Sequence, residues 1–268
     1  MGLEIEFPAS VPELAERLDR EGIVCLEDAV SREWLEAARK SVNHYIAKYG
    51  SRDFLVSAPG EDVNTPAHEL VGNHATKRIL RQLTAARWPR ANRAQSHIAN
   101  GLAVRSGSEG KAESSLFHYD GGIVTMLVPI FIPDAGFGRS GDLVALPNKR
   151  PFRRLLISHA FDKALTHNAI YRWWFARRVF REPQRYLVDL KPGNVYLFWG
   201  YRTLHGNLPC APDLLRATLI LHYGEPHRDT ATLSLARSLS RRRLMRRVQK
   251  AGSVPDPAEP TPETRATA

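Results

Sequence analysis

The triplet His118-Tyr119-Asp120 contains two side chains that could bind one metal ion together. It lies at the start of an apolar run with strand-like composition. In an extended chain, residues i and i+2 point to the same side, so the imidazole and the carboxylate can converge. A second histidine would complete the set of two histidines and one carboxylate that leaves open positions on iron(II) in non-haem oxygenases.

His205 is the candidate for the second histidine. It follows a Lys-Pro-Gly-Asn turn at 191–194 and a short apolar strand, so it lies near the end of a predicted strand. Another triplet of the same pattern, His227-Arg228-Asp229, has no histidine after it and borders a basic segment. The sequence therefore favours a metal site formed by His118, Asp120 and His205.

A candidate carboxylate-binding group follows the predicted ligands. Arg216 supplies a planar, permanently charged fork that suits a carboxylate. Thr218 lies two residues further along the same predicted strand and offers a hydroxyl on the same face. An ordinary surface ion pair and an ordinary strand threonine are the alternative interpretations of these two residues.

The elements that must position these residues are mostly short strands. Strand-like runs separated by turns, with no alternating βαβ pattern, indicate an antiparallel sandwich or barrel. Helical spacing predicts two helices before residue 50, the second with Ser31 as its N-cap and Gly50 as its stop, and a third helix over 160–182. The strand-like runs lie at 22–26, 94–105, 122–132, 186–190, 195–199 and 214–223.

The composition is that of an ordinary globular protein with a basic surplus. The 268 residues are 43% hydrophobic and 25% charged, with a net charge of +10 and only two cysteines. We expect one mainly β domain with N-terminal helices over 1–230, then a basic helix and a tail of disorder-prone composition over 231–268. No apolar run suits a membrane span or a signal peptide, which favours a cytoplasmic location.

The order of these motifs resembles the phytanoyl-CoA dioxygenase family, which includes ectoine hydroxylases. The resemblance rests on His118-x-Asp120, Pro192-Gly193, His205-Gly206 and an arginine eleven positions after the distal histidine, Arg216. The runs at 19–26 and 140–147 are also similar, although 147–150 reads Pro-Asn-Lys-Arg where the family has a Pro-Gly-Ser-His turn. The similarity spans roughly residues 10–225.

The resemblance implies a double-stranded β-helix, a cupin-like jelly roll, with helices packed outside. It implies an iron(II)- and 2-oxoglutarate-dependent dioxygenase that consumes O2, releases succinate and CO2, and hydroxylates a small organic molecule. His118, Asp120 and His205 would hold the iron. The carboxylate at Asp120 favours hydroxylation, because related halogenases have a small residue at that position.

The resemblance also suggests contacts to 2-oxoglutarate. Arg216 and Thr218 would bind its distal carboxylate, Asn207 would reach the cofactor, and Asn100 or Gln95 would bind the 1-carboxylate. Leu127 and Ile130 are candidates for the pocket wall, with ordinary core packing as the alternative, and among the other histidines His222 is the best candidate for the site. Trp173 and Trp174, with Arg172, Arg177 and Arg178, could form a lid or simply an exposed helix face.

Several functions stay open. The same iron chemistry could give desaturation, ring formation or epimerisation, and a jelly roll could also serve as a binding protein without catalysis. The positive charge suits an anionic or carrier-bound substrate. Nucleic acid is a weaker candidate partner, because the basic stretch at 237–250 contains no aromatic residue to stack on bases.

Overall fold

The computed structural model describes residues 10–89, 97–105, 117–152 and 177–225, which belong to one compact unit, Met1–Pro226. Three sets of predictions lie outside the described residues and stay predictions. They are the basic segment with its proposed boundary near 230, most of the helix over 160–182 with its tryptophans, and Gln95.

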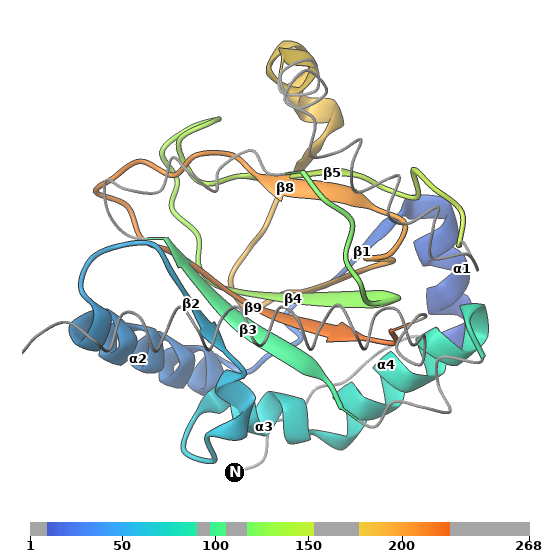
Figure 1. The fold of residues 1–268 in the computed structure, drawn as a ribbon, viewed down its shortest axis with the longest axis horizontal. Helices are drawn as coiled ribbons and strands as arrows, with labels where there is room; N and C mark the ends of the chain where they lie inside the picture. The colour runs from blue at the N-terminus through green and yellow to red at the C-terminus, as the bar shows by residue number, and fades with distance from the viewer. Residues whose placement is uncertain (1–9, 90–96, 106–116, 153–176, 226–268) are drawn as a thin grey trace, which may run out of the picture. The chain divides into compact units, whose positions relative to one another are not determined.

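Two antiparallel sheets form the centre of this unit, and the smaller lies over one face of the larger (Figure 1). The larger sheet has the strand order β1-β7-β4-β9-β3-β2, and the smaller has the order β6-β5-β8. The described architecture confirms the predicted mainly β fold with outer helices. The strands are β1 Ile23–Leu26, β2 Phe54–Ser57, β3 Ala99–Arg105, β4 Val124–Phe131, β5 Leu143–Leu146, β6 Leu187–Val188, β7 Val195–Phe198, β8 Leu204–Asn207 and β9 Arg216–Tyr223.

Alternation along β9 divides its side chains between two environments. Leu219 and Leu221 belong to the apolar cluster that the larger sheet shares with the helices. Ile220 packs instead with the cluster between the two sheets, which includes Leu127 and Phe198. Since successive side chains of a strand point to opposite faces, Arg216, Thr218 and His222 share the inner face with Ile220.

Helices α1 to α4 cover the outer face of the larger sheet (Figure 1). α2 begins after Ser31, whose Oγ accepts a hydrogen bond from the Trp34 amide at 3.2 Å, and it ends at Gly50, as the sequence predicted. The sequence analysis did not predict α3 and α4. The helices on this face are α1 Val11–Glu21, α2 Arg32–Tyr49, α3 Pro66–Gly72 and α4 His74–Arg87, and short 3-10 turns lie at Pro59–Glu61 and Pro183–Arg185. Residues 177–181 are also helical, as the sequence predicted for the end of the 160–182 segment.

The predicted turn at 191–194 carries the chain from one sheet to the other, because β6 belongs to the smaller sheet and β7 to the larger. The Tyr196 hydroxyl closes this turn: it donates to the Asp189 carbonyl at 2.7 Å and accepts from the Lys191 amide at 2.8 Å. The turn thereby fixes the start of the strand that leads to Gly200 and His205. In the described part of the chain, no helix combines the length and the apolar character that a membrane crossing requires.

Candidate active site

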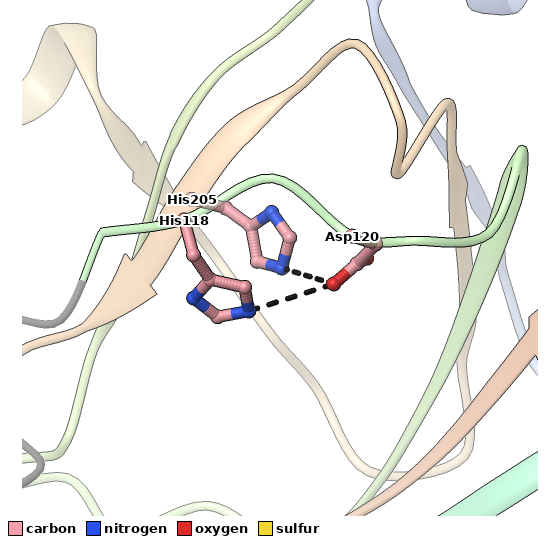
Figure 2. Close-up of side chains that lie close together, drawn as sticks. All are labelled: His118, Asp120 and His205. Atoms are coloured by element: carbon pink, nitrogen blue, oxygen red, sulfur yellow. Dashed lines mark ion pairs between the residues drawn. The ribbon is translucent and has the colours of Figure 1, made fainter. Parts of the chain in front are cut away.

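The side chains of His118, Asp120 and His205 converge on one point between the sheets (Figure 2). The Nε2 atoms of His118 and His205 each lie 3.5 Å from Asp120 Oδ1. The three potential ligand atoms all lie within 4.8 Å of one another. This is a geometry in which a single divalent cation could contact all three.

Backbone hydrogen bonds hold the two contributing segments together. His118 and His205 form a reciprocal antiparallel pair, with N–H···O distances of 2.9 and 3.0 Å. The Asp120 amide donates to the Gly200 carbonyl at 3.0 Å. Residues nearly ninety positions apart are therefore fixed in register by main-chain bonds.

The protonation states suit a metal ion. Burial by itself would raise the pKa of Asp120, but the facing histidines His205, His222 and His118 lower that pKa well below its usual range. Burial lowers the pKa of His205, so its imidazole is neutral near pH 7. The Nδ1 of His205 lies 3.1 Å from the Thr203 carbonyl, which places the proton on Nδ1 and leaves the Nε2 lone pair facing Asp120. An anionic carboxylate and a neutral imidazole are the forms that bind metal.

Three further residues surround the outer oxygen of Asp120. The Thr125 hydroxyl donates to Asp120 Oδ2 at 2.5 Å. His222 Nδ1 lies 3.1 Å from that hydroxyl oxygen and 3.6 Å from Asp120 Oδ2. A Cβ on Gly200 would lie 2.6 Å from the same carboxylate oxygen. The sequence analysis singled out His222 but missed Thr125 and Gly200, whose only signal is their place on or just after strands beside the site.

Arg150 supports the residue between the two ligands of the triplet. Its guanidinium carbon lies 4.0 Å from the ring centroid of Tyr119 and 4.2 Å from that of Tyr201, and its Nε donates to the Tyr201 carbonyl at 2.5 Å. The side chain is buried. Arg150 stands in the segment that departs from the family's Pro-Gly-Ser-His turn, so here this segment packs against the metal-site loop.

Arg216 is buried, and among the described residues no carboxylate forms an ion pair with it, although the nearby Asp142 acts to raise its pKa. Only 4% of it is exposed, and among the described residues no hydrogen bond or ion pair to its guanidinium is found. Arg105, directly opposite on β3, is paired with Asp53 at 2.9 Å. Burial, with the nearby Arg105, lowers the pKa of Arg216 to about 10, so the guanidinium remains charged at neutral pH. Buried charges are ordinarily paired with an opposite charge, and among the described residues the Arg216 guanidinium has no such ion pair.

Thr218 adds a second polar atom without a partner. Its Oγ1 is buried and forms no hydrogen bond. Arg216, but not Thr218, also lines a cavity of about 540 Å³ whose walls include Leu143, Leu190 and the carboxylates of Asp134, Asp142 and Asp189. An anion with several oxygen atoms could satisfy both the guanidinium and the hydroxyl, which is the chemistry that the sequence predicted for a carboxylate.

Asn207 is hydrogen-bonded to Gly141, the glycine that packs against the Arg216 side chain. Its Nδ2 donates to the Gly141 carbonyl at 3.0 Å. Gly141 has a φ of +68°, and a Cβ at this position would lie 2.7 Å from Arg216 Cδ. The contact of Asn207 with a cofactor stays a prediction.

Asn100 lies on the other face of the larger sheet. It pairs with Leu221, which packs toward the helices, and its Oδ1 accepts from the Gly60 amide at 2.8 Å. The expectation that Asn100 contacts a cofactor between the sheets is therefore corrected. Of the two predicted wall residues, Leu127 packs between the sheets, whereas Ile130 packs with the helix-side cluster.

Comparison with known proteins supports the fold. No family model matches the sequence, and no curated protein is significantly similar to it. Among solved structures, a Trichoplax adhaerens prolyl hydroxylase, in complex with a peptide fragment of the oxygen degradation domain of hypoxia inducible factor, is 13% identical with a TM-score of 0.50; the match covers 80% of this chain and 89% of that one. The non-haem α-ketoglutarate-dependent carbocyclase SnoK of nogalamycin biosynthesis is 13% identical with a TM-score of 0.52, covering 85% and 93%.

The fold is the jelly roll of the 2-oxoglutarate oxygenases. The predicted fold is thereby confirmed. At this level of identity the comparison does not single out the phytanoyl-CoA dioxygenase family from other families with the same jelly roll. What the site does must be argued from its own residues.

Proposed function

We propose that this chain is an iron(II)- and 2-oxoglutarate-dependent dioxygenase of the phytanoyl-CoA dioxygenase type that hydroxylates a small organic molecule. One observation carries the proposal beyond the fold. Facing the same space between the sheets as the converging His118, Asp120 and His205, the buried Arg216 and the buried Thr218 hydroxyl form no hydrogen bond within the described residues. A metal site together with a site for a carboxylate is the pair that chelated 2-oxoglutarate requires.

The residues present fit both groups. His118 Nε2, Asp120 Oδ1 and His205 Nε2 would hold the iron, while Arg216 and Thr218 would bind the distal carboxylate of 2-oxoglutarate, with Asn207 nearby. When bound, iron(II) with 2-oxoglutarate and O2 supplies an oxidising chemistry that releases succinate and CO2.

The chain's own contribution is positioning and the exclusion of water. The ligand side chains are fixed by backbone pairing at His118 and His205 and by the bond from the Asp120 amide. Leu127, Phe198 and Tyr196 form an apolar cluster between the sheets. Because charges interact more strongly where water is excluded, this lining strengthens the attraction between Arg216 and a bound carboxylate.

The test is an anaerobic titration of metal-free protein with iron(II) and then 2-oxoglutarate, followed by the weak visible charge-transfer band of the chelate. The band is expected in the wild type and in His44→Ala, an exposed histidine on α2, and is expected to be absent in His118→Ala and His205→Ala. A wild type that binds iron but forms no band would refute the role of Arg216.

Substrate identity is the finer part of the proposal. The net charge of +10 supports an anionic or carrier-bound substrate. Arg178 donates to the Tyr186 hydroxyl at 2.9 Å, so part of its role is within the fold. An unchanged apparent substrate affinity in Arg177→Ala would count against a lid role.

A second outcome of the same chemistry is ring formation, desaturation or epimerisation. The observation that favours it is the shared fold with the carbocyclase, which uses the same co-substrate. Product mass separates the outcomes, since hydroxylation adds one oxygen whereas desaturation or ring closure removes two hydrogens and epimerisation leaves the mass unchanged. Tight ligand binding with no consumption of 2-oxoglutarate would instead indicate a binding protein on the same fold.

A further inference from the structure

The outer oxygen of Asp120 is in contact with the Thr125 hydroxyl, and Gly200 packs closely against both groups. Thr125 lies on β4, directly opposite Phe198 of β7 and His222 of β9, so all three side chains share the inner face. Its side chain is fully buried, and a β-branched side chain has few χ1 states. The hydroxyl is therefore held in one place beside Asp120 Oδ2.

Gly200 packs against the contact between Thr125 and Asp120. A Cβ there would clash first with Thr125 Oγ1 and would lie 2.6 Å from Asp120 Oδ2, closer than real Cβ contacts come. The Gly200 carbonyl meanwhile accepts from the Asp120 amide at 3.0 Å. Any side chain at this position would push both the Thr125 hydroxyl and the Asp120 carboxylate while the Asp120 backbone stayed tied, so glycine is required here for space.

Counting protons fixes the direction of each bond. A threonine hydroxyl has one proton, and an ionised carboxylate only accepts. The proton of Thr125 therefore points to Asp120 Oδ2. The His222 Nδ1, at 3.1 Å from the hydroxyl oxygen, must then carry a proton and donate to it. The result is a directed chain from His222 through Thr125 to Asp120.

We propose that Thr125, braced by His222, is a positioning residue that occupies Asp120 Oδ2 and leaves Oδ1 alone to face the metal. The geometry agrees, because Oδ1 is the oxygen that lies 3.5 Å from both histidine Nε2 atoms. The inference rests on the proposed metal site and adds a residue outside the ligand set. Groups that orient metal ligands in this way typically contribute about 10- to 100-fold to metal affinity.

The test compares Thr125→Val, which keeps the side-chain volume but removes the hydroxyl, with Thr125→Ser, which keeps the hydroxyl. Thr76→Val is the matched control, because Thr76 is fully buried on α4 and its hydroxyl has no hydrogen-bond partner. The dissociation constant for Mn(II) is measured by electron paramagnetic resonance, and the visible spectrum of the Co(II) protein reports coordination geometry.

Thr125→Val is expected to weaken Mn(II) binding about 10- to 100-fold and to change the Co(II) spectrum, as Oδ2 becomes free to bind the metal. Thr125→Ser should recover most of the affinity and the spectrum, and Thr76→Val should match the wild type. Gly200→Ala would place a Cβ against both Thr125 Oγ1 and Asp120 Oδ2, so it should disturb their contact and also weaken Mn(II) binding. If Thr125→Val does not fold, Thr125→Ala takes its place.

Wild-type affinity and a wild-type Co(II) spectrum in the Thr125→Val protein would overturn the inference while leaving the proposed metal site intact. Failure of the wild type itself to bind Mn(II) or Co(II) would overturn the proposed function and this inference with it. The two failures are thus distinguished by the wild-type titration.

Discussion

The two ends of the inner face of β9 differ in how their polar groups are satisfied. Near His222, the candidate ligands are braced by the chain itself: Asp120 by Thr125 and His205 by the Thr203 carbonyl. Near Arg216, a charged guanidinium and the Thr218 hydroxyl are buried without partners among the described residues. The polar groups near His222 are hydrogen-bonded in the absence of a ligand, whereas those near Arg216 are not.

The difference indicates how free energy is divided between folding and binding. A preorganised ligand set binds metal without first reordering its side chains. A buried charge without a partner destabilises the folded state until a counter-charge arrives. The Arg216 end is therefore expected to lower the stability of the ligand-free protein and to recover that free energy when a carboxylate binds.

The largest effect is expected from Arg216→Met, which removes the charge and keeps much of the side-chain volume. Affinity for 2-oxoglutarate should fall about a hundredfold or more, because removing one partner of a buried pair costs about 3–5 kcal/mol. The free energy of unfolding without ligand should stay equal or rise. Arg105→Met, on the strand position opposite, removes a cation that is already paired with Asp53, so it should affect 2-oxoglutarate affinity much less and should lower the free energy of unfolding. Calorimetric titration measures the affinity for 2-oxoglutarate, and urea unfolding measures the free energy of unfolding. A marked loss of stability in ligand-free Arg216→Met would contradict the comparison between the two ends.

A smaller effect is expected from Gly141→Ala. The new Cβ would lie 2.7 Å from Arg216 Cδ on a residue with φ of +68°, so the guanidinium must shift. Because small displacements of a binding group are costly, affinity for 2-oxoglutarate should fall by about tenfold or more while Mn(II) affinity is unchanged. Gly50→Ala is the control for backbone strain alone, since its φ is +83° and no atom lies within 4 Å of the new Cβ. An equal loss of Mn(II) affinity in Gly141→Ala would show that the two ends are not independent.

Thr218→Val should weaken 2-oxoglutarate binding by about tenfold, the contribution of a hydrogen bond to a charged group. In the ligand-free protein the same change removes a buried hydroxyl without a partner, so stability should be unchanged or higher by about 1 kcal/mol. Thr84→Val, at another buried hydroxyl without a partner, should affect stability similarly and leave 2-oxoglutarate binding unchanged. A Thr218→Val protein that binds 2-oxoglutarate like the wild type would remove Thr218 from the site.

The sequence predicted the parts of the site that depend on local periodicity and chain order. The i, i+2 rule placed His118 with Asp120 and Arg216 with Thr218, and the cap residues fixed both ends of α2. Asn100 was assigned wrongly because the sequence does not reveal which alternate side chains of β3 face the space between the sheets. Gly200 and Thr125 were missed because their roles depend on the approach of Asp120, which only the tertiary fold brings to them.

The smallest expected effect concerns the pH dependence of stability. It tests whether His205 is already neutral, and Asp120 already ionised, before a metal binds. Burial lowers the pKa of His205 below its ordinary 6.5. Between the folded and unfolded pKa values the unfolded chain binds more protons, so stability is lost as the pH falls below about 6.5. Asp120 also has a lowered pKa, but its window begins only below the ordinary 3.8.

Urea unfolding of metal-free protein at pH values above and below about 6.5 measures this contribution, which for one group is at most about 1.4 kcal/mol per pH unit. His205→Gln, which cannot titrate, should show a shallower loss of stability with falling pH than the wild type. His44→Gln, at an exposed position, should keep the wild-type slope. Equal slopes in all three proteins would mean that His205 is not held neutral by burial, and the metal end would then need a deprotonation step before it could bind its ion.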